Sequence, residues 1–165
     1  MGLGRRFQNY PRLLERTYRF ALWLFARLEP LFTRIGDERL QRWMRGPEEV
    51  GKRWIFDCRM CGQCVLHSTG MTCPMTCPKN LRNGPCGGVR ADGNCEVLPE
   101  MRCVWVEAYE RSLVMTQYGR YLRILQPPVD HQLEGTSAWV NLLTGADRLP
   151  LPGWPAATEK PTVGT

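Results

Sequence analysis

The sequence is poor in histidine and has no long apolar run. Its 165 residues include two histidines, His67 and His131, and neither lies in a motif typical of a catalytic triad or of a nucleophile paired with a base. The apolar run Phe20–Ala26 is much shorter than the roughly 20 residues that cross a bilayer. A (β/α)8 barrel needs about 250 residues, so the chain holds no such barrel. We therefore expect no catalysis by this chain alone.

A concentrated basic segment is also missing. The formal net charge is +6, and residues 1–57 hold twelve Lys and Arg against seven Asp and Glu, whereas the rest of the chain holds ten against nine. Nowhere do five or six basic residues follow one another, and no fingerprint of a nucleic-acid-binding fold is present. We expect no nucleic-acid partner.

The first predicted helix covers residues 12–29. Apolar side chains recur there at steps of three and four, and four arginines trace a second, basic stripe: Arg12, Arg16, Arg19 and Arg27. Such a helix can pack on its own domain, lie on an anionic membrane surface, or bury itself against a partner chain, and the sequence leaves the three alternatives open. The segment lacks the cleavage site of an export signal, so we expect a cytoplasmic protein, with peripheral membrane attachment as the alternative.

A second helix is predicted at Leu31–Arg45, which makes an N-terminal helical hairpin. Pro30 is expected to end or kink the first helix, because proline lacks the N–H that an interior helical residue donates. Gly46 and Pro47 form a typical C-terminal stop signal for the second helix.

Further helices are predicted at Val104–Gly119 and at Ser137–Leu143, the latter capped by Thr136 or Ser137. Leu149–Thr165 is expected to form an extended or disordered arm. The predicted fold class is mainly α with a cysteine-rich, irregular metal-binding centre: an N-terminal helical hairpin, metal-held loops, one following helix and an extended C-terminal arm. The corresponding domain division is 1–50 for the basic, apolar helical region, 51–125 for the metal-binding domain and 126–165 for the Pro-rich arm.

Eight cysteines are crowded into 46 residues. The segment from Cys58 to Cys103 also holds six glycines and four prolines, so we expect little secondary structure there. Clustered cysteines form disulfides in secreted proteins and bind metal in the cytosol, and a disulfide framework is the less favoured alternative here. We expect metal to stabilise this segment in place of a large core. The predicted ligands are Cys58, Cys61, Cys64, Cys73, Cys77, Cys86, Cys95 and Cys103.

The spacing of the first three cysteines suits an iron–sulfur cluster. Cys58, Cys61 and Cys64 are separated by two residues each, which is typical of three ligands of one [4Fe–4S] cluster. The fourth ligand in such sites is often followed by proline, and both Cys73 and Cys77 have this feature. Soft thiolate ligands select iron–sulfur clusters or zinc. Iron–sulfur and zinc therefore both remain open, as does the choice of fourth ligand.

Several separated motifs, occurring in order over roughly residues 55–145, resemble the cysteine-rich methylenetetrahydrofolate reductase C-terminal family. These are Cys61–Leu66 (CGQCVL), Cys73–Lys79 (CPMTCPK), Leu81–Gly88 (LRNGPCGG), Gly93–Val97 (GNCEV), Cys103–Trp105, Pro127–Asp130 and Thr136–Trp139. The N-terminal helices lie outside this resemblance.

The resemblance implies a stand-alone accessory subunit that docks on a separate, flavin-bearing reductase barrel. In that arrangement the metalloprotein helps to feed electrons from a low-potential donor protein to the partner's flavin, which reduces methylene- to methyltetrahydrofolate. A zinc-stabilised interaction module without a redox role is the alternative. Apolar side chains in Leu13–Met44 and Trp139–Trp154 exceed what the cysteine region can bury, which indicates an interface.

Overall fold

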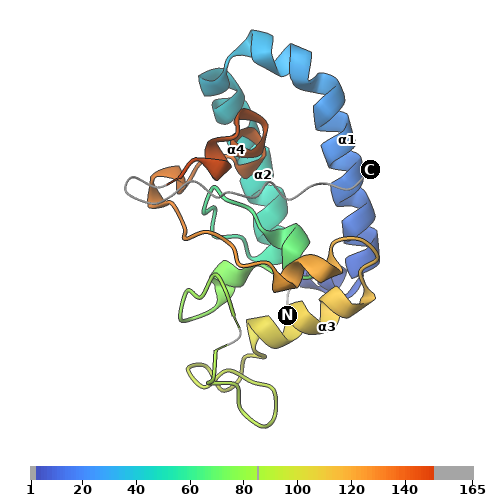
Figure 1. The fold of residues 1–165 in the computed structure, drawn as a ribbon, viewed down its shortest axis with the longest axis vertical. Coiled ribbons are helices and arrows are strands. Elements are labelled where there is room, and N and C mark those ends of the chain that lie inside the picture. The colour runs from blue at the N-terminus through green and yellow to red at the C-terminus, as the bar shows by residue number, and fades with distance from the viewer. Residues whose placement is uncertain (1–2, 85, 151–165) are drawn as a thin grey trace.

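The computed structural model describes residues 3–84 and 86–150. Two long helices form an antiparallel hairpin: α1 (Pro11–Ile35) runs along one side, and α2 (Asp37–Phe56) returns beside it (Figure 1). The turn between them is made at Gly36, whose φ of +85° lies in the region that favours glycine. The predicted mainly helical fold and its N-terminal hairpin are confirmed.

Neither predicted stop signal in the hairpin ends a helix. α1 continues through Pro30 to Ile35, and α2 continues through Gly46 and Pro47 to Phe56. Both prolines are exposed, as are Ala26 and Trp43, four residues before them. Water can therefore bind the carbonyl groups that each proline leaves without an N–H partner, and the helices tolerate the loss.

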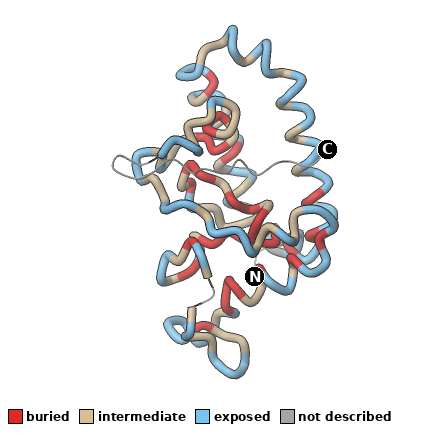
Figure 2. The backbone as a smooth tube through the Cα atoms, viewed as in Figure 1, coloured by how far each residue is buried: buried red, intermediate tan, exposed pale blue. Residues whose placement is uncertain are grey.

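The segment after α2 has the scant secondary structure predicted for it. Within the described residues no strand forms; the backbone pairs only at isolated bridges, Val89 with Cys95 and Asn94 with Arg102. Figure 2 shows that much of the loop between α2 and α3 is nevertheless buried. Its small core contains Leu66, Met71, Cys73 and Met115, with side chains of α1 and α2 packed around them.

α3 (Val104–Val114) is shorter than predicted, because its continuation is captured by a carboxylate of α1. Glu15, 1% exposed, accepts hydrogen bonds from the backbone N–H groups of Thr116, Gln117 and Tyr118 at 2.8–2.9 Å. These N–H groups would otherwise bond to carbonyls of a longer α3. The same contacts fix α1 against the segment that follows α3.

The short predicted helix is α4 (Ala138–Thr144), and Ser137 is its cap, accepting from the N–H of Val140. Trp139 on this helix packs against Phe25 and Tyr18 of α1, with ring centroids 4.8 and 5.5 Å apart. This part of the predicted C-terminal arm thus lies on its own domain. Residues 151–165 of the predicted arm, which include Trp154, lie outside the described residues.

In the part of the chain that the structure describes, no helix combines the length and apolar character needed to span a bilayer.

Candidate metal centre

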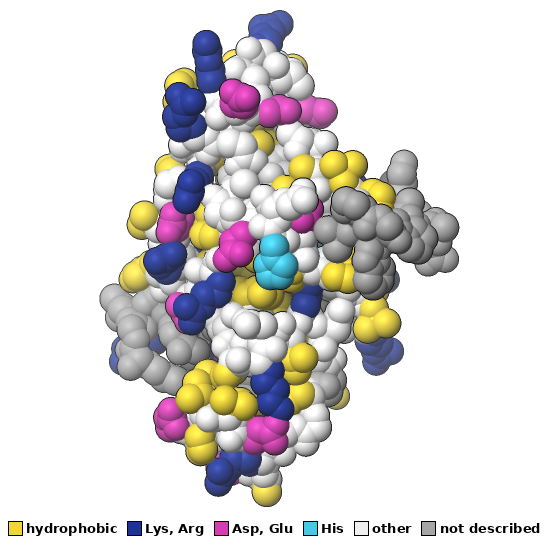
Figure 3. Space-filling view, turned by 90° about the vertical axis from the view of Figure 1, so that its left-hand side faces the viewer, with side chains coloured by type: hydrophobic (Ala, Val, Ile, Leu, Met, Phe, Trp, Pro, Cys, Tyr) yellow, Lys and Arg dark blue, Asp and Glu magenta, His cyan; other side chains and the backbone are white. Residues whose placement is uncertain are grey.

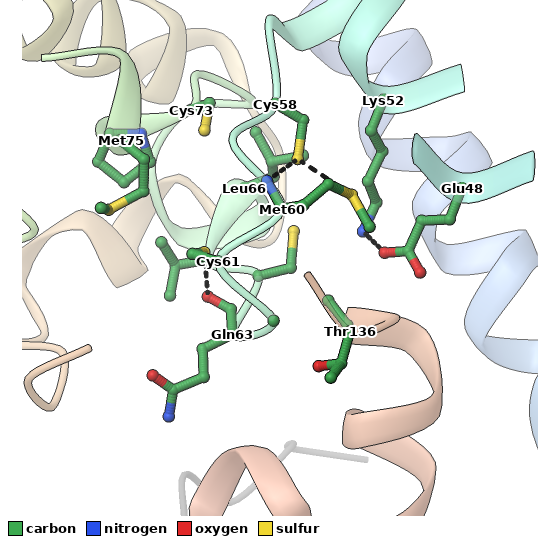
Figure 4. Close-up of a pocket in the computed structure, with 15 residues that line it drawn as sticks. Glu48, Lys52, Cys58, Met60, Cys61, Gln63, Leu66, Cys73, Met75 and Thr136 are labelled. Atoms are coloured by element: carbon green, nitrogen blue, oxygen red, sulfur yellow. Dashed lines mark hydrogen bonds and ion pairs between the residues drawn. The ribbon is translucent and has the colours of Figure 1, made fainter. Parts of the chain in front are cut away.

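Four of the predicted ligands line a single cavity: Cys58, Cys61, Cys64 and Cys73. Figure 4 shows the loop of Cys58–Leu66 bringing these thiols between the C-terminal half of α2 and the turn around Cys73. The three closely spaced cysteines thus share one site with Cys73. The sequence had left Cys73 and Cys77 as equal candidates for the fourth position, and the fold brings Cys73 to this cavity.

Left-handed backbone makes the cysteine loop compact. Asp57, Met60 and Gly62 have φ values of 51°, 50° and 75°. A Cβ atom at Gly62 would lie 2.2 Å from the carbonyl oxygen of Leu133, so only glycine fits here. The N–H of Gly135 donates to the carbonyl of Met60 at 2.7 Å. The loop is therefore held directly against the segment that precedes α4.

A network of buried polar side chains connects the same loop to both helices. Asn141 of α4 donates to the carbonyl of Gly62 at 2.9 Å and accepts from Gln41 of α2 at 2.7 Å. Ser137, which is fully buried, donates to the carboxylate of Glu48. Since buried polar groups are costly unless paired, this network favours one arrangement of loop and helices.

The thiols of the cavity interact with one another. The Cys58 sulfur accepts the N–H of Met60 at 3.3 Å. A hydrogen bond with Cys73 is the largest influence on both groups: it lowers the pKa of Cys58 to about 6 and raises that of Cys73. Burial raises the pKa of Cys61. The interaction thus favours the thiolate of Cys58, the form of cysteine that binds metal.

A half-buried lysine and a buried arginine lie near the cavity, and neither was predicted from the sequence. Lys52 of α2 forms an ion pair with Glu48 at 2.5 Å and lies 5.1 Å from the ring centroid of Trp139. Burial lowers the pKa of Lys52, but the thiol of Cys64 and the carboxylate of Glu48 outweigh it, so the net shift is upward. Arg82, 8% exposed, is the second cation. The burial of a basic residue cannot be predicted from the sequence, because it depends on which distant residues pack around it.

The donor set of this cavity consists of thiols, which both iron–sulfur clusters and zinc select as ligands. No three Cys, His, Asp or Glu side chains within residues 3–84 and 86–150 converge closely enough to hold one metal ion. Tetrahedral zinc with bonds near ~2.3 Å needs its sulfurs about 3.8 Å apart. A cubane accepts more widely spaced thiolates, because each binds a different iron. One buried and three half-buried thiols beside two cations also suit a group with net negative charge.

The other four predicted ligands, Cys77, Cys86, Cys95 and Cys103, do not line this cavity. Backbone bonds tie Cys95 to Met101 at 2.9 Å and Cys103 to Gly93 at 3.0 Å. Lys79 lies two residues after Cys77. A hydrogen bond with Glu96 is the main cause that raises the pKa of Lys79, and the thiols of Cys86 and Cys95 contribute to the same shift. These four cysteines belong to a separate looped region, at the lower end of Figure 1.

His67 does not line the cysteine cavity and lies instead in a cluster of aromatic rings. Its ring stacks on Tyr18 at 5.4 Å with an interplanar angle of 5°, and the edge of Tyr118 lies 5.6 Å away. Burial among these rings lowers the pKa of His67 to about 4. The imidazole is therefore neutral at physiological pH and acts as a packing residue.

Comparison with known proteins gives one family. A sequence model described as methylene-tetrahydrofolate reductase C terminal matches residues 38–132, more than half of the chain. The match takes in nearly all of α2, which the sequence analysis had placed outside the resemblance, and so includes both Glu48 and Lys52. Searches of curated proteins and of solved structures gave no match. The order of cysteine motifs and the extent of this match show that the chain belongs to the methylene-tetrahydrofolate reductase C-terminal family.

Proposed function

We propose that the chain is the accessory iron–sulfur subunit of a methylenetetrahydrofolate reductase and passes electrons to the flavin of a separate barrel subunit. The observation that carries this proposal is the cavity lined by Cys58, Cys61, Cys64 and Cys73 in a member of this family. A [4Fe–4S] cluster held by these thiolates supplies a one-electron carrier. The cations Lys52 and Arg82 balance the negative charge that such a centre brings into the protein.

Exposed apolar side chains on the hairpin support docking to the reductase. Phe20, Trp23 and Trp43 are 61, 54 and 66% exposed. Large apolar groups left on a surface are typical of interfaces, and aromatic residues contribute much of the binding energy there. The side of the molecule seen in Figure 3 instead mixes basic, acidic and apolar side chains. We therefore propose the hairpin as the surface that the reductase covers, in the cytoplasm.

We also propose a zinc ion in the region of Cys77–Cys103. Its four thiols would have to draw together on binding, since no three of them converge on one ion in the described residues. Cys77, Cys86, Cys95 and Cys103 lie in loops whose buried apolar cluster is small: Cys103, Trp105 and Ala108. A structural ion would supply the folding free energy that such a cluster lacks. If both regions hold zinc, the chain is an interaction module without a redox role.

The proposal is tested by co-expressing the chain with a flavin-bearing methylenetetrahydrofolate reductase from the same organism and purifying both anaerobically. We expect co-elution, a brown colour with broad visible absorption, and about four iron and four sulfide per filled cubane site. A colourless complex that contains zinc alone would establish the interaction module. A chain that elutes apart from the reductase, and whose deletion leaves methylenetetrahydrofolate reduction unchanged, would exclude the proposed function.

A further inference from the structure

We infer that Arg82 is a positioning residue of the metal centre: it holds the loop of Cys61–Cys64 and directs an unpaired N–H and an uncompensated positive charge at the bound cluster. The inference rests on the proposed function. It extends that function by assigning control of the reduction potential to one residue outside the cysteine set.

Two of the three guanidinium nitrogens of Arg82 serve as structural donors. Nε donates to the carbonyl of Pro127 at 2.9 Å, and Nη2 donates to the carbonyl of Gln63 at 3.2 Å. Gln63 lies between the ligands Cys61 and Cys64. Arg82 therefore joins the cysteine loop to the Pro-rich segment before α4, and its own side chain is fixed at both points.

The third nitrogen is buried without a partner. Nη1 is one of three buried side-chain N and O atoms in the described residues that make no hydrogen bond. A buried donor left without an acceptor is costly, and such an exception calls for an explanation by a ligand or ion. Sulfur atoms of an iron–sulfur cluster and its thiolates accept N–H bonds, which alter the reduction potential.

Arg82 does not itself line the cavity but is bonded to Gln63, which does. Burial lowers the pKa of Arg82, and the thiols of Cys61, Cys64 and Cys73 act in the opposite direction, Cys61 most strongly. The Cys61 thiol also donates to the carbonyl of Gln63 at 3.6 Å, so it shares an acceptor with Nη2. When Cys61 loses its proton to bind metal, Arg82 still holds that carbonyl.

Arg82 differs from the other cation in its charge balance. Lys52 is paired with the carboxylate of Glu48, so the pair together is neutral. In the described part of the chain, no carboxylate forms an ion pair with Arg82. It bonds to the carbonyl groups of Pro127 and Gln63 and also interacts with the thiol of Cys61. One-electron reduction adds a negative charge to the cluster, which a nearby uncompensated cation stabilises. Arg82 should therefore raise the reduction potential.

The test compares Arg82→Met, Arg82→Lys and Arg59→Met in the complex with the reductase. Arg59 is a matched control, since it follows Cys58 directly but is exposed and lies 3.5 Å from Asp57. Iron and sulfide are counted per chain. The cluster is then titrated anaerobically with dithionite, which donates the electron, and followed by visible bleaching and electron paramagnetic resonance.

We expect Arg82→Met to shift the midpoint potential to more negative values and to change the resonance of the reduced cluster. Arg82→Lys, which keeps the charge, should lie between that variant and the wild type, and Arg59→Met should match the wild type. Equal potentials in Arg82→Met and the wild type, or equal shifts in Arg82→Met and Arg59→Met, would overturn the inference.

The variant Arg82→Lys separates a loss of folding from a loss of the positive charge. If Arg82→Met binds no cluster while Arg82→Lys binds it with a potential near that of the wild type, the charge at this position is confirmed as the requirement. If Arg82→Lys also loses the cluster, Arg82 acts only through its carbonyl bonds and the inference is wrong. A wild-type complex without iron would instead contradict the proposed function itself, before any variant is compared.

Discussion

The two groups of cysteines differ in what surrounds them. Cys58–Cys73 lies between α1, α2 and α4 and is held by a network of buried polar side chains. Cys77–Cys103 lies in loops with isolated backbone bridges and a small apolar cluster. The first region is organised by packing and by hydrogen bonds between protein groups. The second has fewer such contacts, so its structure depends more on what its thiols bind.

The ion pairs of the two regions show the same contrast. Lys52 and Glu48 are both largely buried, and Glu48 is bonded further to Ser137. The pair of Lys79 and Glu96 is exposed to solvent on both sides. Buried pairs are strongly destabilising when one partner is removed, whereas exposed pairs contribute little. Charge therefore helps to fix the geometry around the first group of cysteines but not around the second.

Removing metal should give the largest difference between the two cysteine regions. We expect chelation to unfold Cys77–Cys103, since metal binding to a structural thiolate site contributes on the order of 10 kcal/mol. The hairpin of α1 and α2 should persist, because the hydrogen bonds of Glu15 and Asn141 need no metal. Amide hydrogen exchange before and after anaerobic chelation measures both regions at once. Equal protection of Cys77–Cys103 with and without metal would contradict this prediction.

A pair of glycine substitutions should separate the regions more finely. Gly62→Ala places a side chain against the carbonyl of Leu133 at a φ of +75°, so we expect a loss of about 3 kcal/mol in unfolding free energy. Metal bound by the first group should fall with it. Gly87→Ala, beside Cys86, is the matched control, because a Cβ there meets nothing within 4 Å. Denaturant unfolding and iron content decide the matter, and similar losses in both variants would refute the proposed difference.

The sequence predicts the elements of this fold better than their ends. Apolar spacing indicated the hairpin, and the two candidate caps Thr136 and Ser137 indicated the start of α4, with Ser137 as the cap in the structure. The stop signals at Pro30 and Pro47 were misleading, because exposed helical turns can lose one hydrogen bond to water. α3 ends early because Glu15, about 100 residues before, captures its N–H groups. Local patterns carry no information about a partner so distant along the chain.

In the candidate site, too, features set by local spacing could be predicted from the sequence, whereas features set by packing between distant segments could not. Cysteine spacing predicted that Cys58, Cys61 and Cys64 lie close together, because only two residues separate each from the next. The choice of Cys73 over Cys77 depends on how the following turn folds back, and the positions of Lys52 and Arg82 depend on helix and loop packing. Lys52 looks like one more basic residue in a basic segment. Its burial follows only from the docking of α4, through Trp139 and Ser137.

Acid should produce the smallest effect, confined to the helical frame of the first region. Burial acts to raise the pKa of Glu15, but hydrogen bonds from Tyr118, Thr116 and Gln117 outweigh it, and the net shift is downward from 4.5. A lowered pKa in the folded state contributes stability that is present above pH 4.5 and is lost as pH falls through the folded value.

Glu15→Gln should therefore lower the unfolding free energy by about 2 kcal/mol at pH 7, and the difference from the wild type should shrink as pH falls below 4.5. Thermal unfolding of both chains between pH 7 and pH 3 measures this, and comparing them cancels any loss of metal common to both. Glu29→Gln, at an exposed position of α1, serves as the control. A difference that stays constant across this range would show that the Glu15 charge does not hold α1 to the segment after α3.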